Sequence, residues 1–106
     1  MEKKNVVIVH GWGAESKKLE PLAENLEKLG WKVLLIKLPG FELSPPKKVW
    51  GIDEYGEYIG KESRDFFDSE RFFYFGHSFG GRIGIKLASS HRKSLSGLIL
   101  CSASGL

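Results

Sequence analysis

The chain has 106 residues, 42% of them hydrophobic and 12% aromatic, which fits one domain with a core and excludes a disordered or low-complexity protein. Its 16 lysines and arginines against 13 aspartates and glutamates leave a net charge of +3. These basic residues are scattered, so no nucleic-acid partner is indicated. The single cysteine, Cys101, cannot form an internal disulfide, and the apolar run at residues 6–9 is too short for a signal peptide or a membrane span. We therefore expect a soluble, cytoplasmic protein with no membrane partner, metal or cofactor.

The first two elements along the chain are a predicted strand and a predicted helix. Residues 6–9 are apolar and β-branched, a pattern typical of a strand that is buried on both faces. Residues 19–29 then place leucines at helical spacing, with charged residues between them. Pro21 fits the first helical turn, and Gly30 stands where a helix takes its left-handed stop.

The rest of the chain repeats this alternation. Gly56 and Gly60 fall in the next predicted helix, at about residues 52–67, and each lowers its stability by about 1 kcal/mol relative to alanine. Gly80, Gly84 and Ala88 form a row of small residues that would let the last helix approach the sheet closely. We expect strands at residues 33–36, 72–75 and 98–101, a loop at 41–51, and helices at about 52–67 and 79–90.

Strands that alternate with helices, through connections too long for hairpins, predict right-handed β-α-β units. The expected fold is therefore α/β: one domain over residues 1–106, with a doubly wound parallel sheet of about four strands and three helices. In such sheets ligands bind outside the carboxyl ends of the strands. An active site is thus expected among the loops at residues 10–13, 39–44, 76–81 and 102–106.

Residues 76–80 read Gly-His-Ser-Phe-Gly and match the pattern G-x-S-x-G. The pattern alone is common by chance, but here it lies between a predicted strand and a predicted helix, which is the context it requires. The flanking glycines relieve crowding at a sharp turn, and the turn exposes the Ser78 hydroxyl at a helix N-terminus. Peptide N–H groups and the helix dipole favour a developing negative charge there, so Ser78 is the candidate nucleophile.

A second motif, His10-Gly11-Trp12-Gly13, ends the first predicted strand. On its own it could simply terminate that strand. Acyl chemistry, however, needs two peptide N–H donors for the oxyanion, one from the residue after the nucleophile and one from a loop after an early strand. Here those donors would be Phe79 and Trp12. Two such motifs on neighbouring strands favour the functional interpretation.

On these residues the chain resembles the N-terminal half of an α/β-hydrolase, of the soluble serine esterase and carbon–carbon-bond hydrolase type. The resemblance covers nearly the whole chain but about half of the family's fold. It implies that the strand at 33–36 lies outermost, followed by 6–9, 72–75 and 98–101, with the switch point between the first and third strands. The matching segments are residues 10–13, Pro39-Gly40-Phe41 with Ser44, residues 76–81, and residues 98–103.

The resemblance implies that Ser78 attacks the carbonyl of a small acyl substrate and forms an acyl-enzyme. Trp12, Phe41 and Phe79 suggest an apolar acyl pocket, although they could equally be core residues. The substrate-binding candidates on the same loops are His10, Gly11, Phe41 and His77.

In the family, the triad acid and histidine follow the nucleophile on later strands. This chain departs from that pattern because it stops before either residue. His91 stands about 20 Å from Ser78 along the last helix, and His10 and His77 are interpreted as packing or hydrogen-bonding residues. Asp53, Asp65 and Asp68 fall on a solvated face. Alone, the chain is expected to be nearly inactive.

The last strand would leave an unpaired apolar edge at Leu98, Ile99 and Leu100, which proteins normally cover. We favour a fragment of a longer enzyme, truncated after the strand that ends near Cys101. The alternatives are a split enzyme completed by a second chain and a domain that dimerises along this edge.

Two other functions are compatible with an α/β fold of this kind. The first is a non-catalytic binding or interaction module that uses the Ser78 turn as a ligand cradle. The second is a mononucleotide-binding domain, which is disfavoured because the glycine-rich loops lack both a phosphate-loop Lys-Ser/Thr and the G-x-G-x-x-G spacing.

Overall fold

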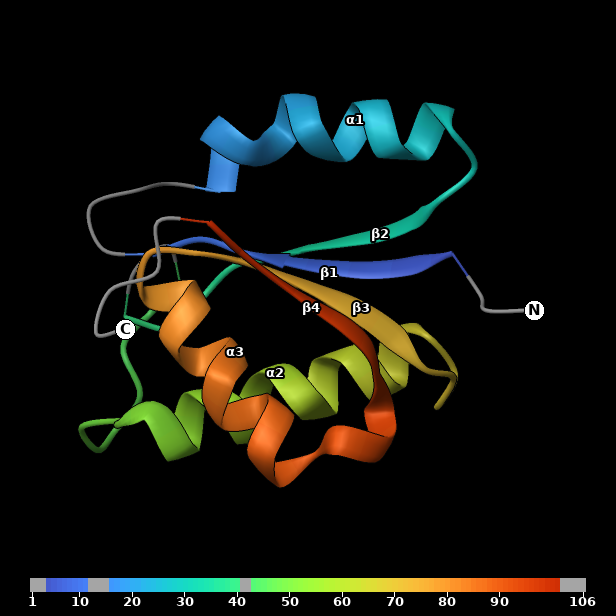
Figure 1. The fold of residues 1–106 in the computed structure, drawn as a ribbon. Helices are drawn as coiled ribbons and strands as arrows, with labels where there is room; N and C mark the ends of the chain where they lie inside the picture. Colours follow the sequence, from blue (N-terminus) through green and yellow to red (C-terminus); the bar gives the residue numbers. More distant parts are fainter. Residues whose placement is uncertain (1–3, 12–15, 41–42, 102–106) are drawn as a thin grey trace.

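The structure is a computed structural model that describes residues 4–11, 16–40 and 43–101. The four expected strands and three expected helices are present (Figure 1). Two short 3-10 helices, η1 (Ser16–Leu19) and η2 (Arg92–Ser94), accompany them. In chain order the main elements are β1 (Asn5–Val9), α1 (Glu20–Lys28), β2 (Lys32–Ile36), α2 (Ile52–Phe66), β3 (Phe72–His77), α3 (Phe79–Ser90) and β4 (Leu95–Cys101).

The strands form one parallel sheet in the order β2-β1-β3-β4, which confirms the strand order predicted from the resemblance. Val9 at the end of β1 lies beside Ile36 of β2 and Gly76 of β3. The chain first steps from β1 to one neighbour and later adds β3 on the other side, so the order reverses between β1 and β3. Ligands bind at this kind of switch point in open α/β sheets.

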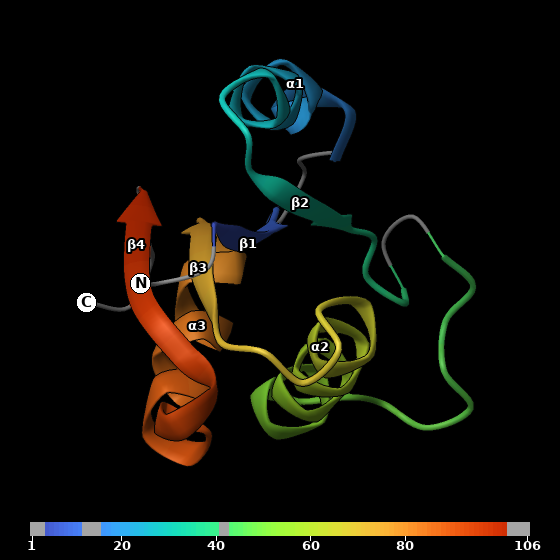
Figure 2. The ribbon, with the colours of Figure 1, turned by 90° about the vertical axis from the view of Figure 1, so that its right-hand side faces the viewer.

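The molecule has three layers, with α1 on one face of the sheet and α2 and α3 on the other (Figure 2). Successive residues of a strand point to opposite faces, so β1 contributes to two cores. Val6 and Ile8 pack with Ala23 of α1, whereas Val7 and Val9 join the larger cluster under α2 and α3. The expectation of a strand buried on both faces is therefore confirmed.

Local signals place the helix ends. Pro21 lies in the first turn of α1, and Gly30 follows the helix at φ +93°, as expected for a proline start and a glycine stop. At the start of α2, the Glu54 side chain accepts the Gly51 N–H at 2.7 Å. Gly60, which weakens α2 as a helix former, is buried against α3, where an added Cβ would lie 3.5 Å from Leu87 Cδ1.

β4 begins at Leu95, three residues before the predicted start. Phe72 pairs with Leu95 but Phe73 pairs with Gly97, an irregular register that leaves Ser96 as the extra residue. A Cβ at Gly97 would lie 2.8 Å from the Phe73 ring. Because Ser96 and Gly97 interrupt the apolar run, the sequence pattern did not show this part of the strand.

Within the described ranges, no helix is both long enough and apolar enough to cross a membrane.

Candidate active site

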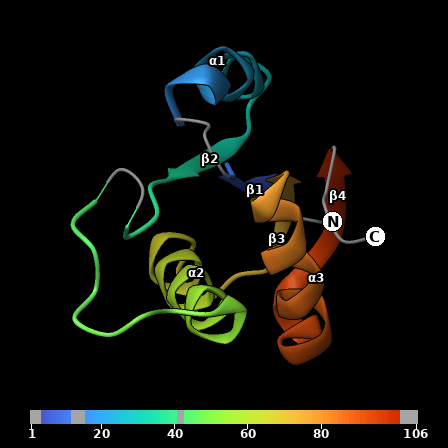
Figure 3. The same ribbon diagram turned by 90° about the vertical axis from the view of Figure 1, so that its left-hand side faces the viewer.

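The turn between β3 and α3 consists of a single residue, Ser78, which adopts φ +57° and ψ −119°. A residue other than glycine at positive φ costs on the order of 1 to 3 kcal/mol, and such strain gathers at functional sites. The half-buried Ser78 lies directly before the N-terminus of α3, where the helix dipole favours negative charge. Figure 3 views the molecule from this end, with the start of α3 beside the end of β1.

Three glycines bring the backbones of this turn and of β1 together. A Cβ on Gly76 would lie 2.6 Å from the Gly80 carbonyl oxygen, and one on Gly80 would lie 2.3 Å from the Val9 carbonyl oxygen. A Cβ on Gly11 would lie 2.5 Å from the Phe79 nitrogen. No other residue fits these positions without a backbone shift, which explains Gly76 and Gly80 of the first motif and Gly11 of the second.

Hydrogen bonds fix the same turn. The Ser78 N–H donates to the Cys101 carbonyl at the end of β4 (3.1 Å), and the Gly81 N–H donates to the Ser78 carbonyl (2.9 Å). From beneath, the fully buried Tyr74 hydroxyl donates to the Gly80 carbonyl at 2.7 Å. Burial raises the pKa of Tyr74 well above its usual value of 10.0, so this hydroxyl keeps its proton and remains a donor.

The predicted site residues differ in burial and in surroundings. Phe79 is the first residue of α3, and its side chain is 8% exposed within the main core, so the core alternative holds for this ring. His10 is fully buried, with Nδ1 3.5 Å from the Gly11 carbonyl oxygen, which favours the packing interpretation. His77 is half-buried at the end of β3. The candidates Trp12 and Phe41 lie outside the described residues.

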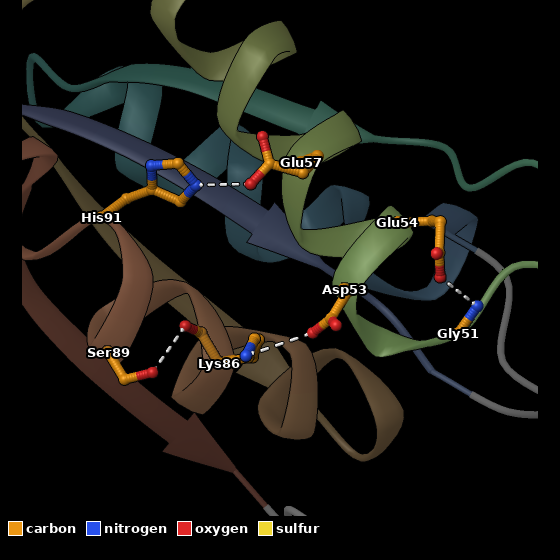
Figure 4. Close-up of polar contacts among 7 residues, drawn as sticks. All are labelled: Gly51, Asp53, Glu54, Glu57, Lys86, Ser89 and His91. Atoms are coloured by element: carbon orange, nitrogen blue, oxygen red, sulfur yellow. Dashed lines mark hydrogen bonds and ion pairs between the residues drawn. The ribbon is translucent and has the colours of Figure 1, made fainter.

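The third histidine and the acidic residues of α2 lie away from the turn. His91 Nε2 lies 3.0 Å from Glu57 Oε1, and Lys86 Nζ lies 3.2 Å from Asp53 Oδ1, so both pairs bridge α2 and α3 (Figure 4). The twelve residues of α3 stand between Ser78 and His91, which places the two about 20 Å apart at 1.5 Å per residue. Within the described residues, no side chain forms a hydrogen bond with the Ser78 hydroxyl.

An open groove of about 520 Å³ lies apart from Ser78. It runs along the outer face of α2, and none of its lining residues belongs to the turn. Within the described ranges, no cluster of three or more His, Cys, Asp or Glu residues is arranged to hold a metal ion.

The family described as alpha/beta hydrolase fold matches residues 4–105. The chain belongs to this family. Its strand order is therefore that of an α/β-hydrolase, and the matched segment spans both glycine motifs.

Relatives of this α/β-hydrolase chain include a monoacylglycerol lipase from Paleococcus ferrophilus, 29% identical with a TM-score of 0.83, over 97% of this chain and 40% of that one. MGS-MChE2, an alpha/beta hydrolase enzyme from a sediment metagenome of the Mar Chica lagoon in Morocco, is 30% identical with a TM-score of 0.75, over 99% and 47%. The biotin biosynthesis bifunctional protein BioHC of Cellvibrio japonicus is 28% identical over 103 residues, 97% of this chain and 19% of that protein. The chain thus spans about a fifth of its curated relative and less than half of these solved structures.

Sequence reasoning missed Tyr55 as a residue of this region of the hydrolase. Its hydroxyl donates to the Pro39 carbonyl at 2.8 Å, and its ring lies edge-on to the Phe79 ring with centroids 5.7 Å apart. The spacing of Ile52, Tyr55, Ile59 and Phe66 did indicate a helix. Nothing in the pattern identified its two partners, because Pro39 and Phe79 belong to other parts of the chain and meet Tyr55 only in the folded protein.

Proposed function

We propose that the chain carries the nucleophile and the oxyanion donors of a serine hydrolase that acts on small acyl esters. The observation that carries the proposal is the strained Ser78 turn at the N-terminus of α3, with Gly11 of the neighbouring loop against the Phe79 nitrogen. A similar chain from Paleococcus ferrophilus bears the name monoacylglycerol lipase, which supports an ester as substrate.

In the proposed reaction, Ser78 Oγ attacks the carbonyl carbon of the ester, and the bond from that carbon to the alkoxy oxygen breaks. The serine proton passes through a base to the departing alcohol, and the acyl group stays on Ser78. Water then cleaves the acyl-enzyme to the carboxylic acid and free Ser78. The N–H groups of Phe79 and Trp12 are proposed to hold the oxyanion, and the loss of one such donor costs on the order of 100-fold in turnover.

The base and its acid partner are proposed to come from sequence beyond these residues or from a second chain. No side chain of the described residues is hydrogen-bonded to the Ser78 hydroxyl. Removing a triad member leaves only the catalysis due to the oxyanion donors and to binding. We therefore expect the 106-residue chain by itself to be nearly inactive.

The open edge of β4 is the proposed place where the missing part adds. β4 is an outer strand of the sheet, Ile99 is 49% exposed, and Cys101 is also exposed. Exposed apolar edge strands are normally covered, so we propose that a further strand pairs along Leu98, Ile99 and Leu100.

Labelling with a fluorophosphonate tests the nucleophile in the native product of the gene, together with any partner that copurifies with it. Ser78→Ala should abolish labelling, and mass spectrometry should place the adduct on the peptide that contains Ser78. Ser89→Ala is the matched control, because Ser89 is an exposed serine near the far end of α3 whose hydroxyl bonds only the Lys86 carbonyl. Equal labelling of Ser78→Ala and the parent protein would overturn the nucleophile assignment. Ester binding without turnover would favour the non-catalytic binding module.

A further inference from the structure

We propose that the connection between α3 and β4 is a binding site for a phosphate group, carried either by a small molecule or by a lipid headgroup. The connection lies at the opposite end of α3 from Ser78, so the site is independent of the proposed hydrolysis. It combines an open hollow, four side-chain donors with no partner among the described residues, and a local excess of positive charge.

The hollow has a volume of about 660 Å³ and is lined by one continuous segment of the chain. Helix α3 ends at Ser90, η2 follows at once, and β4 begins at Leu95, so the chain turns back toward the sheet here (Figure 1). All six lining side chains carry an N–H or O–H donor, and none of them is acidic. The lining residues are Ser89, Ser90, His91, Arg92, Lys93 and Ser94.

Hydrogen bonds fix the backbone of this connection. The His91 N–H donates to the Leu87 carbonyl at 2.7 Å, and the Ser94 N–H donates to the His91 carbonyl at 2.9 Å. The Ser89 hydroxyl donates to the Lys86 carbonyl at 3.2 Å (Figure 4). Free carbonyl oxygens at the end of a helix repel anions, and these bonds already satisfy two of them.

Two of the six lining side chains are engaged within the protein. The Ser89 hydroxyl bonds its own helix, and His91 Nε2 lies 3.0 Å from Glu57 Oε1 on α2. Within the described part of the chain, the other four form no side-chain hydrogen bond or ion pair. These four are Ser90, Arg92, Lys93 and Ser94.

The four remaining donors suit the chemistry of a phosphate group. The planar guanidinium of Arg92 can donate two parallel N–H bonds to two phosphate oxygens, and the Lys93 ammonium adds a compact charge. The two serine hydroxyls can donate to further oxygens. Because Arg92 and Lys93 are both exposed, a phosphate group reaches them without any rearrangement of the fold.

The distribution of charge along the chain favours an anion at this end of α3. All 13 acidic residues lie within residues 1–70, which carry a formal charge of −2. Residues 71–106 contain five lysines and arginines and no acidic residue, a formal charge of +5. A surface of one sign raises the local concentration of ions of the opposite sign. The carboxylate that does contact the connection, that of Glu57, pairs with His91 and not with Arg92 or Lys93.

The same cations also have a purely structural interpretation. Basic side chains after the C-terminus of a helix interact favourably with its dipole. In that role Arg92 and Lys93 would add to stability and would bind no ligand. The two interpretations differ in whether phosphate binds, so a binding measurement separates them.

The experiment titrates inorganic phosphate into the native product of the gene, with chloride at matched ionic strength as the reference. We expect saturable NMR shifts of the backbone amides of residues 89–94 with phosphate but not with chloride. Arg92→Gln should weaken phosphate binding about 3- to 10-fold, since it removes a charge-assisted donor pair at an exposed site. Arg82→Gln is the matched control, because it removes the same charge from an exposed position of α3 that does not line the hollow. Its dissociation constant should equal that of the parent.

Vesicles distinguish the two sources of the phosphate group. Sedimentation with phosphatidylcholine vesicles that contain phosphatidic acid, but not with phosphatidylcholine alone, would assign the site to a lipid headgroup, provided that inorganic phosphate releases the protein. Saturable phosphate binding without sedimentation would assign it to a small molecule.

Three results would overturn the proposal. The first is a phosphate titration that shows no more saturation than chloride, whatever the vesicles show. The second is an equal dissociation constant in Arg92→Gln and Arg82→Gln, which would mean that phosphate responds to net charge and not to the hollow. The third is a lower melting temperature of Arg92→Gln with unchanged phosphate binding, the result that helix capping alone predicts.

Discussion

The turn around Ser78 and the outer face where α2 meets α3 are held by different kinds of contact. At the turn, backbone atoms approach so closely that a Cβ on Gly76 or Gly80 would lie within 2.6 Å of another backbone atom. On the outer face, exposed side chains meet in the ion pairs Lys86–Asp53 and His91–Glu57. The close backbone contacts leave no room for an added atom and do not depend on salt. Exposed ion pairs, in contrast, are weak, and dissolved salt screens them. The site geometry is thus fixed by the contacts that are hardest to change.

The largest expected effect comes from breaking the backbone contact. Gly80→Ala would place a Cβ 2.3 Å from the Val9 carbonyl oxygen, and we expect a loss of about 3 kcal/mol or more of unfolding free energy. Urea denaturation followed by circular dichroism measures it. Gly56→Ala is the control, because Gly56 is also a helical glycine but an added Cβ there would meet only Lys86 Cγ, at 4.0 Å. An equal loss of stability in both variants would show that the close approach to Val9 does not make Gly80 necessary.

The next effect concerns the buried hydroxyl beneath the elbow. The pKa of Tyr74 is raised well above 10.0 by burial, so above pH 10.0 the unfolded chain loses this proton while the folded chain keeps it. The contribution of Tyr74 to stability is therefore complete below pH 10.0 and falls as pH rises beyond it, by about a factor of ten in the unfolding constant per pH unit. Tyr74→Phe should reduce this slope by one proton in pH-dependent urea titrations. An identical slope in the variant would contradict the assignment.

A smaller effect tests the backbone strain at Ser78. Ser78 adopts φ +57° and ψ −119°, so Ser78→Gly should be more stable than Ser78→Ala by about 1 kcal/mol, because glycine enters this region at little cost. Both variants remove the hydroxyl, and only the backbone preference differs. Thermal denaturation of the pair gives the difference. Equal melting temperatures would show that the turn is not strained.

The smallest effect is expected on the outer face. In a double-mutant cycle of Lys86→Ala and Asp53→Ala, the coupling energy should be about 0.5 kcal/mol or less, because the Lys86 and Asp53 side chains are 44% and 73% exposed and water screens the pair. It should vanish in about 1 M salt, where charges are screened within roughly 3 Å. A coupling that survives high salt would mean that contacts on the outer face depend as little on salt as the contacts at the Ser78 turn.

The sequence predicted the helices and strands to within a few residues where apolar spacing was regular. It also predicted the sharp turn at Ser78, because glycines at fixed spacing around a serine reflect a steric requirement of the local backbone. It placed the start of β4 at residue 98, since Ser96 and Gly97 look like a loop. The actual start at Leu95 depends on the Phe73 ring, which lies across Gly97 from the neighbouring strand.

By itself, the sequence determined the α/β class, the order of the elements and the glycines that the Ser78 turn requires, because these follow from periodicity and backbone sterics over a few residues. Only the tertiary structure decided that the Phe79 ring belongs to the core, that Tyr74 supports the Gly80 carbonyl and that Tyr55 joins Pro39 to Phe79. The partners of Phe79 and Tyr55 are set when layers from distant parts of the chain pack together, and no local pattern encodes which loop a buried hydroxyl will meet.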